Sequence, residues 1–211
     1  PAALGAKRAY VFFSTQGAEY VLDTRAKLSK ICSFSHNAGI NVTKARFSES
    51  DKILITGNEK GRTFIIHTDD GHLIAELPRS SDTITAVTLH ENANLAASAS
   101  FSKGLIVYRY TTQEVIFEKR LEEVVEMMTF ISENTLLAIT RNGKIIKIDI
   151  AKQRIVQQTL LDENLWPSYL TLSHSKKFVY VGTRESVLFA LHVKSMEVLF
   201  SVKLPYLGIT S

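Results

Sequence analysis

The sequence predicts an all-β fold in which one four-stranded unit is repeated along the chain. Apolar residues come in runs of four to six, rich in Val, Ile, Phe and Tyr and separated by turn residues. Such runs are typical of strands rather than helices. The same order of runs recurs four times at a nearly constant spacing. The segment 121–130 could form a helix by itself, but its second half falls on the first strand of the repeat, so we expect a strand there.

Two sets of anchor residues define the repeat. One set closes the first strand of each unit, the other begins the second strand, and both recur at intervals of 42, 41 and 42 residues. The anchors are Phe47, Leu89, Phe130 and Leu172 for the first set, and Ile53, Leu95, Leu136 and Phe178 for the second. Two independent positions that share one period indicate a structural repeat.

Each whole unit contains the same elements in the same order. In the unit that begins at Val42, the first strand is followed by a polar turn and by a buried second strand at 53–57. A tight turn at 58–61, rich in Gly, Asn and charge, leads to a third strand at 63–67 and a fourth at 73–77. Four antiparallel strands in about 42 residues correspond to one blade of a β-propeller. We expect whole blades at 42–77, 84–121, 124–161 and 167–204.

The two ends of the chain predict parts of further blades. Residues 10–35 match the second, third and fourth strands of a blade, and residues 205–211 match a first strand. In one interpretation the C-terminal strand pairs with the N-terminal three and closes a five-bladed ring, which removes the open edge. In the other, which we favour because the sequence starts without Met and stops abruptly, the 211 residues are one segment of a six- to eight-bladed propeller.

With these blades assigned, the sequence from about Tyr10 onward resembles the WD-repeat and YVTN-like propeller families. WD repeats end the third strand in Trp-Asp, whereas only Asp149 keeps the acid here. The matching pairs are Ile66-His67, Tyr108-Arg109, Ile148-Asp149 and Ala190-Leu191. The buried Asp of the preceding turn is also replaced. We therefore expect hydrophobic packing between neighbouring blades to supply most of the stability.

Composition and charge narrow the function classes. The net charge is +4 and the pI about 9.1, but the basic residues are dispersed, which favours a solvated surface over specific nucleic-acid binding. Cys32 is the only cysteine, so no intrachain disulfide forms, and we expect a reducing compartment, the cytoplasm or the nucleus. No apolar run approaches the roughly 18 residues that span a bilayer, so we expect no transmembrane segment.

The sequence contains no recognisable catalytic, metal or cofactor site. His67 and His72 flank the stretch HTDDGH, but no third ligand is near, and Asp-Gly at this place favours a hairpin turn. Motifs for an activated serine or for a phosphate-binding glycine loop are absent from the sequence. Cys32 falls in a predicted fourth strand, where we expect it to fill space.

Candidate partner-binding residues come from the turns between second and third strands, which carry a base in every whole blade. In WD-like propellers these turns surround the central channel, so the resemblance implies a ring of positive charge that attracts acidic or phosphorylated peptides or anionic lipid. Trp166 is either a contact residue or packs between blades, and Phe101 stands where the sister turns are polar. The candidates are Lys60, Arg62, Phe101, Lys103, Arg141, Lys144, Trp166 and Arg184.

By resemblance, we expect a non-enzymatic scaffold that binds peptides or partner subunits on its rim inside a larger complex. The alternative is a propeller that binds phosphoinositides or other anionic lipids, in which Lys119-Arg120-Leu121 stands roughly where the paired-arginine-glycine signature, absent here, would lie. The segment 179–200 also resembles the repeats of quinone-dependent propeller dehydrogenases. An enzyme is disfavoured, since the acid and metal-binding residues of those enzymes are absent.

Overall fold

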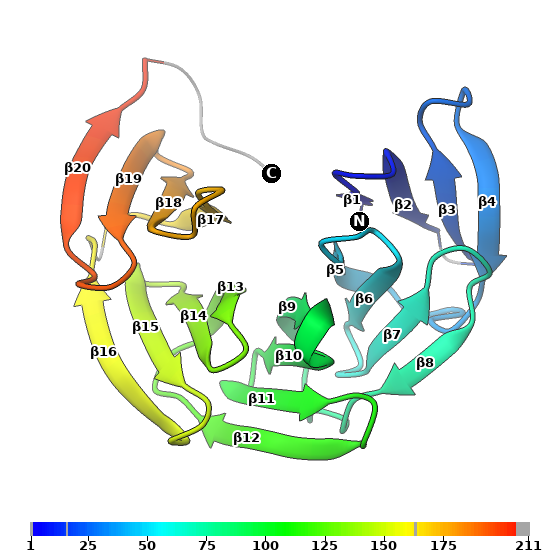
Figure 1. The fold of residues 1–211 in the computed structure, drawn as a ribbon, viewed down its shortest axis with the longest axis horizontal. Coiled ribbons are helices and arrows are strands. Elements are labelled where there is room, and N and C mark those ends of the chain that lie inside the picture. The colour runs from blue at the N-terminus through cyan, green and yellow to red at the C-terminus, as the bar shows by residue number, and fades with distance from the viewer. Residues whose placement is uncertain (1, 16, 163, 206–211) are drawn as a thin grey trace. The chain divides into compact units, whose positions relative to one another are not determined.

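The computed structural model describes residues 2–15, 17–162 and 164–205, and these residues form almost only β-structure (Figure 1). Twenty strands make five four-stranded antiparallel sheets, and each sheet contains four consecutive strands. The one helical element of the described residues is a single 3₁₀ turn, η1 (Glu91–Ala93). The predicted all-β fold of four-stranded blades is therefore confirmed. The chain divides into two compact units, residues 1–121 and 122–211.

The first unit contains three sheets. The first is β1 (Ala2–Leu4), β2 (Tyr10–Ser14), β3 (Glu19–Asp23) and β4 (Ser29–Phe34). The second is β5 (Val42–Phe47), β6 (Ile53–Asn58), β7 (Thr63–His67) and β8 (Leu73–Glu76). The third is β9 (Ile84–His90), β10 (Leu95–Ser100), β11 (Gly104–Arg109) and β12 (Glu114–Arg120).

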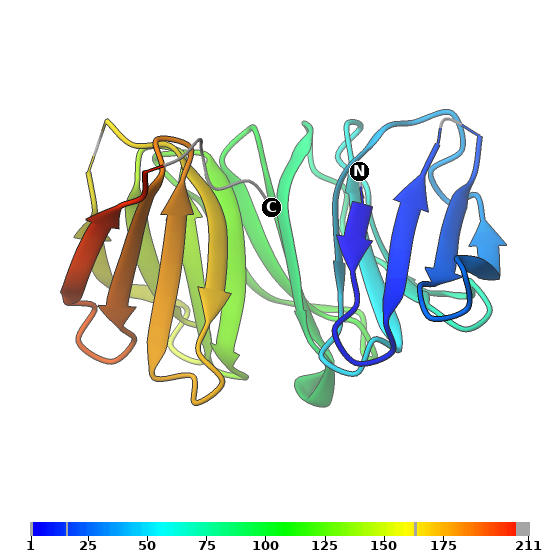
Figure 2. The same cartoon turned by 90° about the horizontal axis from the view of Figure 1, so that it is seen from above.

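The second unit contains two sheets. One is β13 (Val125–Ser132), β14 (Thr135–Thr140), β15 (Lys144–Asp149) and β16 (Arg154–Leu160). The other is β17 (Pro167–Leu172), β18 (Phe178–Thr183), β19 (Val187–His192) and β20 (Val198–Lys203). In each unit the strands run between two edges that carry the turns (Figure 2). We call the edge with the turns between second and third strands the tight-turn edge.

The first sheet corrects one prediction. Residues 10–35 were expected to lack a first strand, but Ala2–Leu4 pairs with β2 in the register Ala2↔Phe13 and Leu4↔Val11. Three residues are too short a run for the sequence pattern to reveal. The place that a C-terminal strand would take in the five-bladed closure is therefore occupied by β1. The first strand predicted at 205–211 lies, apart from Pro205, outside the described residues.

A buried carboxylate holds the start of the chain on the second sheet. Asp51, only 1% exposed in the turn between β5 and β6, accepts hydrogen bonds from the backbone N–H groups of Ala6, Lys7 and Arg8 at 3.2, 2.6 and 2.7 Å. A charged acceptor makes stronger hydrogen bonds than a neutral one. The turn that follows β1 is therefore fixed by a residue more than 40 positions away.

Hydrophobic packing joins neighbouring sheets within each unit. Phe12 and Val21 of the first sheet pack with Leu54 of the second, and Ile65 of the second packs with Tyr108 of the third. In the second unit, Leu137, Ile139 and Ile145 pack against the last sheet, which contributes Val179, Val181, Phe189 and Leu191. Burial of such side chains contributes about 1.5–3 kcal/mol each.

The first two sheets are also joined by a buried polar network that the sequence did not reveal. The side chain of Asn37 donates to the carboxylate of Glu19 and accepts from Asn58 at 2.8 Å. Asn58 in turn accepts from the backbone N–H groups of Lys60 and Arg62, at 2.9 and 3.0 Å. These amides satisfy polar groups that would be costly to bury alone, and they fix the tight turn that carries two of the predicted binding residues.

Candidate interaction surface

The tight turns of four sheets share one hydrogen bond. The residue that follows the second strand donates its backbone N–H to the carbonyl of the residue just before the first strand. The donor–acceptor pairs are Glu59–Asn41, Phe101–Thr83, Arg141–Val124 and Arg184–Trp166, at 3.0, 2.8, 2.8 and 2.9 Å. Phe101, Arg141 and Arg184 therefore occupy equivalent positions at the tight-turn edge, on a backbone that the sheet holds rigid.

A second shared contact closes these turns. In the second unit, the hydroxyls of Thr140 and Thr183, each the last residue of a second strand, accept the backbone N–H of Lys144 and Val187, both at 3.2 Å. In the turn between Thr140 and Lys144, Gly143 has a φ of 77°, and a Cβ at this residue would lie 2.6 Å from the carbonyl oxygen of Asp162. Only glycine suits that position.

Three of the predicted binding residues come together in the second unit. The guanidinium carbon of Arg184 lies 4.3 Å from the centroid of the Trp166 ring, and that of Arg141 lies 5.2 Å from it. Both distances are within the range of a cation–π interaction, which is worth about 0.5–1 kcal/mol at exposed sites. Trp166 is still 36% exposed, so it is neither a buried packing residue nor a free side chain. We call Arg141, Trp166 and Arg184 the Trp166 cluster.

The two arginines of the cluster differ in their partners. Arg141 pairs with Glu126, Nη2 to Oε1 at 2.6 Å. Arg184 is exposed, and no described carboxylate lies within ion-pair distance of it. The neighbouring Glu185 instead accepts the backbone N–H of Trp166 at 2.9 Å. Among the described residues, the cluster therefore presents one guanidinium without a carboxylate partner beside an accessible indole.

Two other predicted residues are partnered inside the protein. Arg62 donates twice to Glu76, at 2.7 and 3.0 Å, and its guanidinium lies over the ring of Phe64. Lys144 lies 2.7 Å from the carboxylate of Glu123. Hydrogen bonds to these carboxylates raise the pKa of Arg62 and of Lys144 above their ordinary values. The charges of Arg62 and Lys144 are thus already paired within their own units, and the ring of positive charge stays a prediction.

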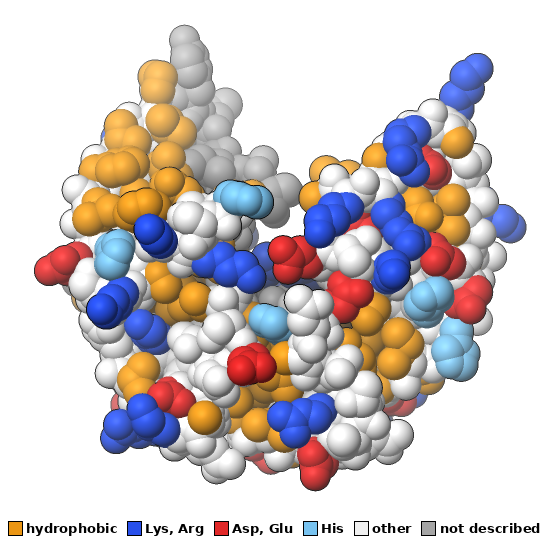
Figure 3. Space-filling model, in the orientation of Figure 1, with side chains coloured by type: hydrophobic (Ala, Val, Ile, Leu, Met, Phe, Trp, Pro, Cys, Tyr) orange, Lys and Arg blue, Asp and Glu red, His pale blue; other side chains and the backbone are white. Residues whose placement is uncertain are grey.

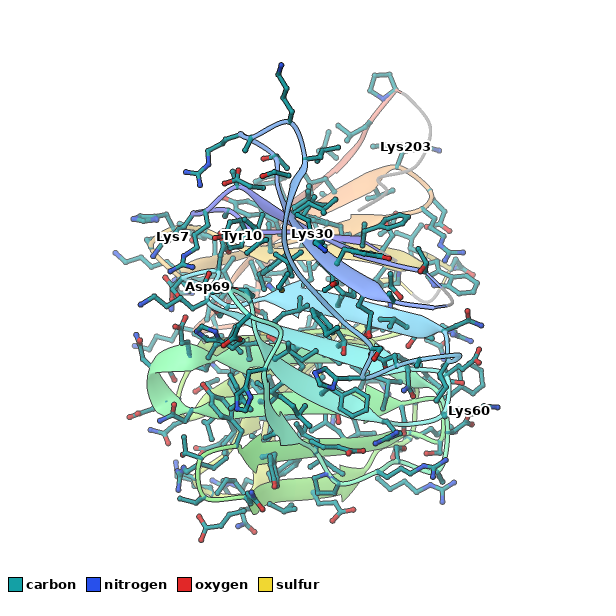
Figure 4. All side chains as sticks on the ribbon, turned by 90° about the vertical axis from the view of Figure 1, so that its right-hand side faces the viewer. Lys7, Tyr10, Lys30, Lys60, Asp69 and Lys203 are labelled. Carbon is teal, nitrogen blue, oxygen red and sulfur yellow. The ribbon has the colours of Figure 1, made fainter. Side chains whose placement is uncertain are left out.

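Lys60, Phe101 and Lys103 are exposed in the first unit. Figure 4 shows Lys60 at the tight-turn edge of that unit, opposite the edge with Lys7, Tyr10 and Asp69. Neither Lys60 nor Lys103 has a described carboxylate within ion-pair distance. These three residues belong to a different unit from the Trp166 cluster, and their part in binding stays a prediction.

The histidine-rich turn folds as a hairpin. The Asp70 carboxylate accepts the backbone N–H of His72 at 2.9 Å and lies 3.2 Å from Nδ1 of His67. The first of these bonds, with a smaller contribution from His67, lowers the pKa of Asp70. In the described ranges, no three His, Cys, Asp or Glu side chains gather in a group that could hold a metal ion.

Cys32 lies buried in β4, where its thiol donates to the carbonyl of Thr68 at 3.2 Å. Burial raises the pKa of this thiol to about 11.

Among the described residues there is no helix with the length and apolar character needed to cross a membrane.

The structure also shows an exposed apolar strand that the sequence did not predict. All six residues of β20 are exposed, and its apolar members are Val198, Leu199, Phe200 and Val202. Figure 3 shows hydrophobic side chains gathered over this strand. β20 (VLFSVK) is more apolar than the outer strands β12 (EVIFEKR) and β16 (RIVQQTL), but its sequence does not show whether another group covers it.

Neither family models nor curated proteins match the sequence. Solved structures do match the fold. The β-propeller domain of Cps50 (Swd1) from Myceliophteria thermophila is 16% identical, with a TM-score of 0.69 over 82% of this chain and 62% of that chain. The computationally designed Ika8 protein is also 16% identical, with a TM-score of 0.79 over 99% of this chain and 63% of that one.

These similarities establish the fold. The chain consists of four-stranded β-propeller blades. It spans less than two thirds of the length of either matched structure. The resemblance to WD repeats in particular stays a prediction, because identity this low shows architecture alone.

Proposed function

We propose that this chain is part of a non-enzymatic propeller scaffold that binds acidic segments of partner proteins through the Trp166 cluster. The observation that carries the proposal is the guanidinium of Arg184, which lies over a Trp166 ring that remains accessible and pairs with no carboxylate of the described residues. Trp and Arg are the residue types most enriched at the energetic centres of protein interfaces. A partner carboxylate would accept two parallel hydrogen bonds from Arg184, and an adjacent apolar side chain would cover the indole.

The surroundings of the cluster support a preformed site. The backbone hydrogen bond from Arg184 to the carbonyl of Trp166 and the bond from Trp166 to Glu185 fix both main chains. Little conformational freedom is then lost when a partner binds, which favours affinity. The pairing of Arg141 with Glu126 leaves Arg184 as the cation that a partner meets.

Trp166 is the only tryptophan of the chain, so its fluorescence tests the proposal directly. The probe is a synthetic peptide with alternating Glu and Leu, and the control peptide has Gln in place of Glu. We expect the Glu peptide to change Trp166 emission saturably and more weakly at high salt. Arg184→Glu should weaken this binding at least about 10-fold. Lys177→Glu, an equal charge change in the turn between β17 and β18, should not.

Equal binding of both peptides, or equal weakening by both substitutions, would refute the proposal. The first result would show that charge recognition is absent. The second would show that only the net charge of the chain matters.

We also propose that a further blade covers the β17–β20 sheet, as in a propeller of six to eight blades. In each sheet the pairing of the third with the outer strand contains one register shift, and the outer-strand residue that follows this shift along the chain occupies an equivalent position in all sheets. In two sheets the side chain of this residue contacts the next blade. Cys32 donates to Thr68, and Gln157 donates to the carbonyl of Ser195 at 2.5 Å. The equivalent residue of the last sheet is Phe200, which is 50% exposed. The greater length of the matched Cps50 (Swd1) β-propeller domain, of which this chain covers 62%, agrees with this proposal.

A further inference from the structure

The first unit contains a cavity of about 250 Å³ at the tight-turn edge of the β9–β12 sheet. One face of this sheet packs on the second sheet. Near the start of β10 this face is apolar, and Ala96 and its partner Tyr108 belong to the hydrophobic core. Farther along the same face, alternation places Ser98 and Ser100 on β10 and Gly104 on β11. These small residues do not fill the space between the sheets, and the hydrophobic core gives way to a polar hollow.

Three basic residues border the cavity, but strand alternation turns Lys119 to the face opposite Glu118 and Arg120, so Arg79 and Arg120 are the cations that face it. Arg79 comes from the linker between β8 and β9, and Lys119 and Arg120 come from the end of β12. Arg79 donates from Nε to the carbonyl of Lys60 at 3.1 Å, which anchors the linker. Within the described ranges, no carboxylate lies within ion-pair distance of any of the three. Their charges therefore remain available to a ligand.

Serine hydroxyls complete the lining. Ser98 and Ser100 are buried residues, and Oγ of Ser100 lies 2.9 Å from Oγ of Ser102. The hydroxyl of Ser98 forms no hydrogen bond with the described residues. Ser80 and Ser81 close the cavity from the linker side. Hydroxyl and guanidinium donors together suit the oxygens of a phosphate group.

Glu118 narrows the class of ligand. It lines the cavity on the same strand as Arg120, two positions away, so a carboxylate faces the same space as the cations. It would disfavour a bare anion, but it accepts hydrogen bonds from a hydroxyl or ammonium group. The volume is about eight times the ~30 Å³ that one water occupies in the liquid, and it is below the range of drug-sized pockets.

We propose that this cavity binds a small phosphate monoester that also carries hydroxyl or amino groups. The phosphate lies between Arg79 and Arg120, and the hydroxyl or amino end donates to Glu118. This site goes beyond the proposed scaffold function, because it lies in the first unit and uses none of the Trp166 cluster. Its ligand would be a soluble compound or the headgroup of a lipid, since both present the same monoester.

The test uses the whole chain and calorimetric titration with glycerol 3-phosphate, glycerol and inorganic phosphate. We expect binding of glycerol 3-phosphate, at least about 10-fold weaker binding of inorganic phosphate, and none of glycerol. Arg120→Gln should weaken glycerol 3-phosphate at least about 10-fold, and Lys30→Gln, an exposed base on β4, should not. Ser98→Val places two methyl groups at the cavity wall and should abolish binding while the melting temperature is kept.

The results separate the two sources of the ligand from the absence of a site. Wild-type protein that does not bind glycerol 3-phosphate excludes the soluble ligand. If such protein binds vesicles containing phosphatidylinositol 4-phosphate and loses them with Arg120→Gln, the monoester is a lipid headgroup. If it binds neither, or if Arg120→Gln changes nothing, there is no site. Failure here leaves the peptide assay unaffected, because that assay reads Trp166 in the second unit.

Discussion

Two phenylalanines of the last sheet test whether the face of β20 lacks a covering blade. Phe189 on β19 is 6% exposed and belongs to the hydrophobic core of the second unit, while Phe200 on β20 is 50% exposed. The two residues lie on neighbouring strands, where Phe189 pairs with Ser201 and Ala190 pairs with Phe200. Truncation of each to alanine removes the same atoms from one sheet, so the pair is internally controlled.

The structure predicts different costs for the two substitutions. A buried Phe→Ala change typically costs about 3–5 kcal/mol, from lost transfer free energy and the cavity that remains. A fully buried Phe contributes about 1.5–3 kcal/mol of transfer free energy, so Phe200, which is 50% exposed, should lose about 0.8–1.5 kcal/mol. For a chain of this size, 1 kcal/mol corresponds to roughly 2–4 °C in melting temperature. We therefore expect Phe189→Ala to lower the melting temperature by more than about 6 °C and Phe200→Ala by less than about 6 °C.

Urea unfolding followed by Trp166 fluorescence measures both variants, since this tryptophan lies beside β17 of the same sheet. We expect the urea midpoint to fall clearly for Phe189→Ala and less for Phe200→Ala, with similar slopes. Equal losses would refute the reasoning, because they would show that the outer face of β20 is packed in the isolated chain.

Two further predictions concern buried polar groups of the first unit. Asp51→Ala removes the acceptor of three backbone N–H groups and should cost about 2–4 kcal/mol of unfolding free energy. Asp69→Ala removes only an exposed ion pair with Arg8 and should cost less than about 1 kcal/mol. Equal costs in urea titrations would contradict the anchoring role of Asp51. The pKa of about 11 at Cys32, against 9.0 for a free thiol, predicts that iodoacetamide modifies the folded chain at pH 8 about 100-fold more slowly than the urea-unfolded chain, and mass spectrometry that finds rapid modification of folded protein would disprove it. Because the unfolded thiol ionises first, stability should also fall as the pH rises from about 9 to about 11.

Local sequence determined the blades. Strand alternation and turn residues act over a few positions, so the period of about 42 residues placed the four whole units without tertiary information. The exception is β1, whose three residues form a strand only because β2 offers a free edge and Asp51 binds the backbone that follows. A contact between residues 7 and 51 leaves no periodic trace in the sequence.

For the candidate site, too, part of the arrangement follows from the sequence and part only from the tertiary structure. The sequence placed bases in the tight turns, but the structure decided which of them are neutralised, since Glu76 reaches Arg62 and Glu126 reaches Arg141 across paired strands. The sequence offered two roles for Trp166, and the arrangement of Arg141 and Arg184 around the ring determined its environment. The availability of a charge depends on such neighbours and not on residue type.

Phe117 and Phe200 show this limit most directly. Both are phenylalanines on an outer strand, and each is the first residue paired after the register shift of its strand. Phe117 is 3% exposed and Phe200 is 50% exposed. Sequence by itself determined that both are apolar strand residues. Only the tertiary structure decided that one is core and the other surface, because burial depends on which groups pack against a side chain and not on the strand that carries it.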